Sequence, residues 1–227
     1  MYVPPLFREE RIDEMAELMR RYPLATLITV GADGLIANHV PMLYDAEPAP
    51  FGTLRGHVAR ANPQWRMERP ETGALAVFQG PQAYVSPSFY PSKRQHPEVV
   101  PTWNYAVVHA HGRAIIHDDA AWLRRMVTDL TEAQEAAFDE PWHVSDAPAG
   151  YIDGLLKAIV GVELRVTGLE GKWKANQNRA EVDQAGVVER LARSEEPGAR
   201  EMAEIQRGRR GTPMSGPFPA PPHKNRS

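Results

Sequence analysis

A turn signal between two apolar segments near the N-terminus constrains the fold more than any other feature of the chain. Residues 25–30 are apolar or β-branched, residues 31–34 (Gly-Ala-Asp-Gly) favour a turn, and a strand pattern resumes over residues 35–44. Two strand-like segments separated by so short a turn are typical of a β-hairpin. The sequence therefore predicts that the fold begins with a hairpin.

Further strand patterns follow along the chain, and helical patterns separate some of them. Residues 159–166 show the clearest alternation, with valine or leucine at every second position. We expect the other strands over residues 52–58, 73–80, 83–86 and 105–117, and helices over residues 11–22, 120–137, 151–157 and 180–193, with Asp118 and Asp119 at the cap of the second helix. Six or so antiparallel strands with peripheral helices predict a mainly β fold that closes, or nearly closes, into a barrel.

The composition fits one globular domain with an added tail. The chain has 227 residues, of which 42% are hydrophobic and 24% are charged. We expect the folded domain to span residues 1–194. Residues 195–227 are poor in aliphatic side chains and end in a proline-rich segment, so we predict that they form a disordered tail.

Charge and cysteine content exclude several classes of function. The formal net charge of −3 gives no general attraction to nucleic acid or anionic lipid. With no cysteine, the chain cannot form disulfides, thiolate metal sites or a cysteine nucleophile. The N-terminus does not resemble a signal peptide, and no apolar segment approaches the roughly 20 residues that cross a bilayer. We therefore expect a cytoplasmic protein without a membrane partner.

Two polar clusters lie in the first third of the chain. Asn38, His39 and Pro41 belong to the second strand of the hairpin, where a proline indicates an edge strand or a bulge that another group can approach. Arg55, His57 and Arg60 surround a glycine and precede an Asn-Pro helix start, which would suit a phosphate. The alternatives are a simple edge strand and a capped turn with solvated arginines.

Two aromatic clusters follow. Residues 84–91 and 100–105 combine aromatic rings, hydroxyl groups and prolines, so they could form an apolar wall for a planar heterocycle or a hydrophobic cluster under a loop. Residues 171–179 combine two lysines, an arginine, three amides and a tryptophan directly after the last predicted strand. That composition suits an anionic phosphate tail, or a solvated basic loop.

His109 and His111 would lie on the same face of a strand, as two metal ligands could. No acidic residue or third histidine completes a ligand set at a convincing spacing in the sequence. We therefore predict core or interface histidines here and no metal site. P-loop, Rossmann and nucleophile-elbow motifs are also absent from the sequence.

The clusters, taken in order, resemble the PaiB family of FMN-binding negative transcriptional regulators, within the FMN-binding split-barrel group. The resemblance covers about residues 1–193. The segments that carry it are 1–7 (MYVPPLF), 57–65 (HVARANPQW), 80–90 (GPQAYVSPSFY), 100–105 (VPTWNY), 159–163 (IVGVE) and 171–179 (GKWKANQNR). Trp173 and residues 175–176 depart from the leucine and serine expected near the lysines.

The resemblance implies a six-stranded antiparallel split barrel and a homodimer that holds FMN between its subunits. The isoalloxazine ring would lie along the strand with Asn38, His39 and Pro41. The phosphate contacts would come from Arg55, His57, Arg60, Ser86, Lys172 and Lys174. The ring wall and its polar contacts would come from Trp103, Asn104, Gln177 and Asn178.

Three functions remain open at this stage. The resemblance implies repression of transcription, with contact to DNA made directly or through a partner. The sequence shows no helix-turn-helix and no basic recognition face, which favours indirect contact. An FMN-dependent oxidoreductase acting on a small molecule is the alternative. A haem-binding or haem-degrading protein is a third reading, with His39, His57, His109 or His111 as the axial ligand.

Overall fold

The predicted hairpin is formed by β2 (Leu24–Gly31) and β3 (Gly34–Pro41). Their register pairs Gly31 with Gly34, so residues 32 and 33 make the turn, and Gly34 has a φ of +120° that favours glycine. This computed structural model describes residues 1–66, 73–95 and 97–209. The hairpin prediction is confirmed.

The described residues form a sheet of eight strands, where we expected six. The strand order is β3-β2-β6-β7-β8-β5-β4, and β1 pairs with β8. The difference comes partly from two short strands that simple alternation does not reveal, namely β1 with two residues and β4 with three. The remaining strands are β1 (Arg8–Glu9), β4 (Leu43–Asp45), β5 (Thr53–Ala59), β6 (Ala74–Val85), β7 (Thr102–His117) and β8 (Ile159–Lys174).

The architecture is a mostly antiparallel sheet with helices. The pairs β2 with β3, β2 with β6, β4 with β5 and β5 with β8 are all antiparallel. Strand β3, at one end of the strand order, also approaches β5. A Cβ atom on Gly56 of β5 would lie only 2.6 Å from the carbonyl oxygen of Pro41 on β3. The two strands thus meet without a ladder between them, in keeping with the predicted nearly closed barrel.

Strands β6, β7 and β8 are longer than expected. Residues 73–80 and 83–86 belong to the single strand β6, in which Gly80 and Pro81 are both buried and shift the alternation of the side chains. β8 continues to Lys174, so residues 171–174 lie on a strand and not in a loop. The local turn signals at these positions are overridden by burial in the sheet.

The described chain forms two compact units. The first contains Met1 and residues 9–80 and 107–172, and the second contains residues 2–8, 81–106 and those after 172. Strands β6, β7 and β8 each contribute residues to both units. The first unit holds α1 (Ile12–Arg21), α2 (Ala120–Glu135) and α3 (Ala149–Leu156), and the second holds α4 (Glu181–Ala192) and α5 (Pro197–Gly208).

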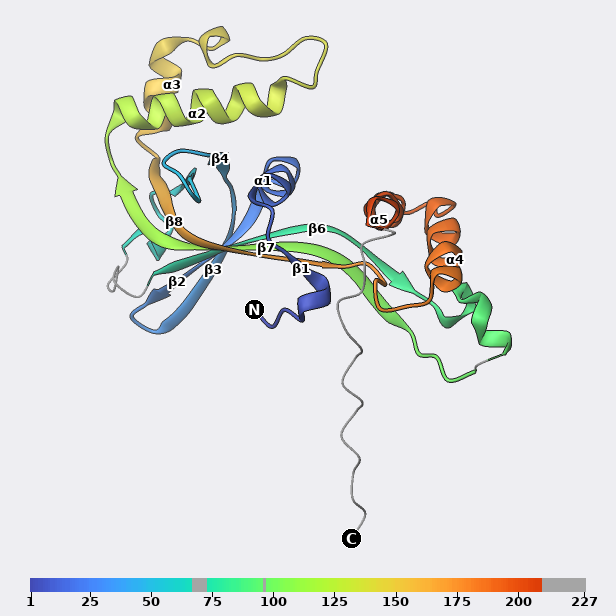
Figure 1. The fold of residues 1–227 in the computed structure, drawn as a ribbon. Helices are drawn as coiled ribbons and strands as arrows, with labels where there is room; N and C mark the ends of the chain where they lie inside the picture. Colours follow the sequence, from blue (N-terminus) through green and yellow to red (C-terminus); the bar gives the residue numbers. More distant parts are fainter. Residues whose placement is uncertain (67–72, 96, 210–227) are drawn as a thin grey trace. The chain divides into compact units, whose positions relative to one another are not determined.

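In the first unit, α2 and α3 pack against each other through an apolar cluster that includes Leu123, Met126 and Leu156 (Figure 1). Asp119 caps α2 as expected, since its carboxylate accepts a hydrogen bond from the backbone N–H of Trp122 at 2.7 Å. Gly161 of β8 makes room for the Trp122 ring, because a Cβ atom there would lie 2.2 Å from it. The glycine lets α2 approach the sheet closely.

The second unit corrects the expectation for the tail. We predicted disorder from residue 195, but residues 197–208 form α5, in which Met202 and Ala203 are completely buried. These side chains pack with Val187 and Leu191 of α4 in one core cluster. The apolar residues of α5 are few but fall on one face, which is enough to bury a short helix. Residues 210–227 lie outside the described part of the chain.

Among the described residues, no helix is both long enough and apolar enough to cross a membrane.

Candidate functional site

An exposed aromatic pair marks the second unit. The rings of Tyr84 on β6 and Trp103 on β7 meet edge to face with their centroids 5.8 Å apart, and the residues are 48% and 52% exposed. Lys174 lies beside them on β8, where its ammonium donates a hydrogen bond to the backbone oxygen of Trp103 at 2.7 Å and another to the hydroxyl of Thr102. An accessible aromatic surface next to a lysine suits a planar, anionic ligand.

Asn104 follows Trp103 on β7, points to the opposite face of the strand and is completely buried. Neither its amide nitrogen nor its amide oxygen has a hydrogen-bond partner among the described residues. Leaving a buried polar group unpaired costs about 1–3 kcal/mol. Asn104 is therefore expected to stabilise the fold less than leucine would at the same position.

The segment after β8 is shaped by its own amides. Gln177 accepts a hydrogen bond from the backbone N–H of Ala175 at 2.7 Å and donates one to the backbone oxygen of Trp173 at 2.6 Å. Asn176 is buried with a φ of 61°, a conformation that asparagine tolerates better than most residues. Gln177 therefore holds the turn, while Asn178 is exposed.

Ser86 also has a local structural role. Its hydroxyl accepts a hydrogen bond from the backbone N–H of Ser88 and caps the 3₁₀ turn Pro87–Phe89. Lys172 lies two residues before Lys174 on β8 and is half-buried. Both lysines alternate with Gly171, Trp173 and Ala175, which are buried. The alternation puts the two lysines on the same face of the strand.

In the first unit, Arg55 and His57 lie two residues apart on β5 and share a face of the sheet. The Arg55 guanidinium is 2.7 Å from a carboxylate oxygen of Asp129 on α2 and 3.8 Å from one of Asp45. Its charge is therefore matched by acidic neighbours. The Nδ1 atom of His57 is buried without a described partner, and this burial lowers the pKa of the imidazole.

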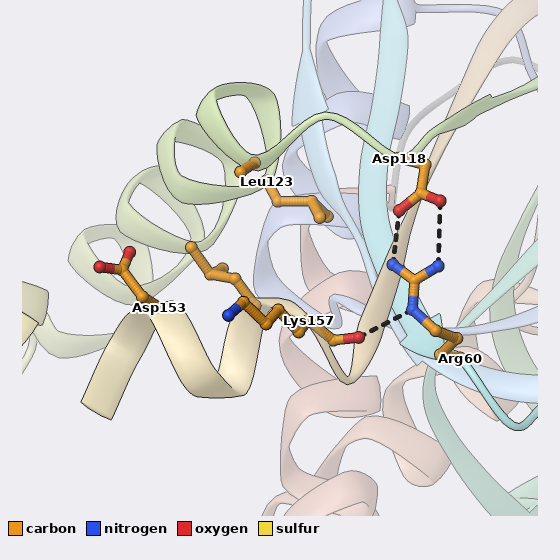
Figure 2. Close-up of a pocket in the computed structure, with 7 residues that line it drawn as sticks. Arg60, Asp118, Leu123, Asp153 and Lys157 are labelled. Atoms are coloured by element: carbon orange, nitrogen blue, oxygen red, sulfur yellow. Dashed lines mark hydrogen bonds and ion pairs between the residues drawn. The ribbon is translucent and has the colours of Figure 1, made fainter. Parts of the chain in front are cut away.

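Arg60 lines a pocket of about 330 Å³ in the first unit (Figure 2). Its guanidinium forms a two-pronged ion pair with Asp118, at 2.9 and 2.5 Å, and donates to the backbone oxygens of Lys157 and Ile159. The hydrogen bond from Arg60 lowers the pKa of the Asp118 carboxyl. Arg60 thus joins the end of β5 to the start of α2 and the segment before β8.

Asn38, His39 and Pro41 lie on β3, which stands at one end of the strand order, as the proline predicted. Asn38 donates a hydrogen bond to the side-chain oxygen of Gln64 at 2.8 Å, and buried Gln64 in turn donates to the backbone oxygen of Leu27. His39 and Pro41 are exposed. Asn62 caps the turn Pro63–Trp65 that carries Gln64, as expected.

The structure thus divides the predicted cofactor residues between the two units. The first unit contains Asn38, His39, Pro41, Arg55, His57, Arg60 and Lys172, and the second contains Ser86, Trp103, Asn104, Lys174, Gln177 and Asn178. Within the second unit, Trp103 and Lys174 are in direct contact. Within the first, Arg55 and His57 share a strand face, whereas Arg60 forms its own ion pair with Asp118.

Sequence reasoning missed two neighbours. It named the 84–91 segment but did not assign Tyr84 as the ring that contacts Trp103. It also found no acidic residue for His109 and His111, whereas the structure brings Glu170 of β8 to them. The signal that could have found Glu170 is the pairing of β7 with β8, which a single sequence does not contain.

Comparisons with known proteins agree with this fold. The chain is 33% identical over 205 residues to "Protease synthase and sporulation protein PAI 2" of Bacillus subtilis, covering 90% of this chain and 96% of that protein. It is 34% identical over 235 residues to an uncharacterised Aspergillus fumigatus protein, covering 83% of this chain and 90% of the relative.

Solved structures of lower sequence identity share the fold. The flavocytochrome Anf3 of Azotobacter vinelandii superposes with a TM-score of 0.54 at 11% identity, covering 79% of this chain and 75% of that one. A 5-nitroimidazole antibiotic resistance protein of Bacteroides thetaiotaomicron superposes with a TM-score of 0.51 at 11% identity, covering 73% and 85%. Residues 1–168 match the family model described as "Putative FMN-binding domain". The chain therefore belongs to this family.

Proposed function

We propose that the protein binds FMN, and that the cluster of Tyr84, Trp103 and Lys174 is the part of its second unit that holds the cofactor. The observation that carries the proposal is the exposed pair of Tyr84 and Trp103, with the Lys174 ammonium hydrogen-bonded to the backbone oxygen of Trp103. Trp103 and Tyr84 would contact the isoalloxazine ring, and Lys174 would meet the phosphate. Bound FMN would supply one- and two-electron redox chemistry.

The donor set fits a flavin in part. The aromatic surface is accessible, and the Lys174 ammonium lies beside it, at the backbone oxygen of Trp103. Arg55 and Arg60, which the sequence also offered to the phosphate, are matched by Asp129 and Asp118 in this structure. We therefore propose Lys174, which lies beside the exposed ring pair, for the phosphate, and assign Arg60 to holding the start of α2.

Riboflavin provides a direct test of this assignment because it lacks the phosphate. We expect the flavin-free protein to bind FMN at least about tenfold more tightly than riboflavin, a difference of about 1.4 kcal/mol. Lys174→Ala should remove most of that difference while leaving riboflavin binding nearly unchanged. Lys157→Ala, an exposed lysine of the first unit, is the matched control. Equal losses for FMN and riboflavin in Lys174→Ala would contradict the phosphate assignment.

The homodimer implied by the resemblance belongs to the same proposal. In it, the partner subunit would complete the cofactor contacts. Light scattering on the purified protein tests the dimer, with twice the mass of one chain as the expected result. A monomer that still binds FMN would overturn the dimer and leave the cofactor proposal in place.

We further propose that regulation of transcription, the role implied by the resemblance, acts through a partner and not through direct contact with DNA. Helix α5 carries Arg200 and Arg207 together with Glu201 and Glu204, so these charges balance. A helix with balanced charge gains little from phosphate contacts. Salt-resistant retention of a specific DNA duplex by the pure protein would overturn this proposal, whereas steady oxidation of NADH would favour the oxidoreductase reading.

A further inference from the structure

His109, His111 and Glu170 form a cluster in the first unit that the flavin proposal does not use. The two histidines lie two residues apart on β7, so their side chains leave the strand on the same face. Their ring centroids are 6.4 Å apart and the rings are tilted by 55°. Two imidazoles at this spacing can reach a common point between them.

Glu170 supplies the third group from the next strand, β8. Its Oε2 atom lies 2.9 Å from Nε2 of His111. One ligand atom from each of the three residues can be chosen so that all three lie within 4.8 Å of one another. Bonds of about 2.0–2.2 Å to zinc put neighbouring ligand atoms roughly 3–3.5 Å apart, so a small rotation of the His109 ring brings the set to coordinating distance.

The surroundings leave room for a further ligand. His111 is exposed and forms part of the wall of a pocket of about 700 Å³, which Arg113 and Thr167 also line. Three protein ligands with an open side are the arrangement that catalytic metal sites use to hold water or a substrate. A closed structural site would instead take four ligands from the protein.

The same carboxylate already binds a cation in this structure. The ammonium nitrogen of Met1 lies 2.6 Å from Oε2 of Glu170. A metal ion at the cluster would replace this ammonium as the positive partner of Glu170. The Met1 ammonium competes with the metal ion for Glu170 and so weakens metal binding. It does not prevent binding, because it does not take up the metal-binding nitrogen atoms of the two histidines.

We propose that His109, His111 and Glu170 bind a divalent transition-metal ion, with Zn²⁺ as the probe, and leave a coordination position open toward the pocket. Mixed imidazole and carboxylate ligands suit zinc and its neighbours in the first transition row, whereas calcium and magnesium prefer oxygen ligands alone. The site does not depend on FMN, so it stands or falls separately from the proposed flavin function.

Calorimetric titration of metal- and flavin-free protein without a polyhistidine tag tests the proposal. We expect one Zn²⁺ to bind per chain, and His111→Ala, His109→Ala and Glu170→Gln each to weaken binding by at least about tenfold. Co²⁺ should give visible absorption bands that the same variants lose. Exposed His111 is the safest of the three positions, because its replacement leaves the buried face of β7 unchanged.

His117→Ala is the matched control. His117 also pairs with a glutamate, Glu163, at 3.1 Å, but belongs to no three-ligand cluster among the described residues. Its removal should leave Zn²⁺ binding unchanged. Lack of saturable binding at millimolar Zn²⁺, or binding that all three ligand variants retain, would overturn the proposal. Circular dichroism of each variant establishes that the loss of binding is not a loss of folding.

Discussion

Tyr84 and Trp103 meet edge to face with their ring centroids 5.8 Å apart on neighbouring strands, and about half of each residue is exposed. Stacking of a heterocycle on an aromatic side chain contributes about 1–3 kcal/mol in the comparable case of nucleobases. Trp103→Ala should therefore weaken FMN binding by roughly tenfold or more. Quenching of flavin fluorescence measures the effect.

The control for this change is Trp142→Ala, since Trp142 is also partly exposed but belongs to the first unit. It should leave the affinity for FMN unchanged. Equal losses from the two tryptophan variants would mean that Trp103 acts through general stability, and the assignment of the ring contact would fail.

Asn104 presents a trade-off between stability and function. Because its buried amide lacks partners among the described residues, Asn104→Leu should raise the free energy of unfolding of the flavin-free protein by about 1 kcal/mol. It should also weaken FMN binding, because the resemblance implies that Asn104 is one of the cofactor contacts. Chemical denaturation and flavin titration measure the two effects. If Asn104→Leu destabilised the protein instead, the Asn104 amide would have to form hydrogen bonds in solution.

Gly161 tests the packing of α2 on the sheet. A Cβ atom at this position would lie 2.2 Å from the Trp122 ring, so Gly161→Ala should destabilise the fold by about 1–3 kcal/mol. Gly154 on α3 has open space around it, and Gly154→Ala should stabilise the helix by about 0.5–1 kcal/mol. Thermal unfolding compares the two variants. Equal shifts in Tm would contradict the close approach of Trp122.

His57 predicts a pH dependence of stability. Burial lowers its pKa from the usual 6.5, so the unfolded chain binds a proton more readily than the folded chain. The free energy of unfolding should therefore fall as the pH drops below about 6.5. His57→Gln should make this fall shallower. Denaturation of the flavin-free protein at pH 7.5 and 5.5 measures the difference, and an unchanged slope in His57→Gln would contradict the account.

The sequence predicts those parts of the fold that depend on local signals. The β2–β3 hairpin follows from its turn, and the start of α2 from the cap at Asp119. Strand β1 was missed because two residues carry no measurable alternation, and β4 was not separated from the predicted strand over residues 35–44, which includes its first two residues. Helix α5 was missed because its stability comes from burial of Met202 and Ala203 against α4, which is a tertiary effect.

The candidate site was predictable in composition but not in its pairings. Trp103 and Lys174 were both named from the sequence, yet their contact depends on the alignment of β7 with β8. Arg60 was offered to a phosphate because arginine suits phosphates, and Asp118 was assigned only to the start of a helix. Which cation meets which anion is decided by strand register and helix placement, which composition does not encode.

The most direct test of the central claim is titration of FMN into freshly purified, flavin-free protein, followed by fluorescence quenching and by the visible absorption spectrum. We predict saturable binding of one FMN per chain, with a Kd of about 1 µM or lower, equivalent to about −8 kcal/mol. Trp103→Ala and Lys174→Ala should each weaken it. Absence of saturable binding at millimolar FMN would contradict the proposed function and every assignment made to the flavin.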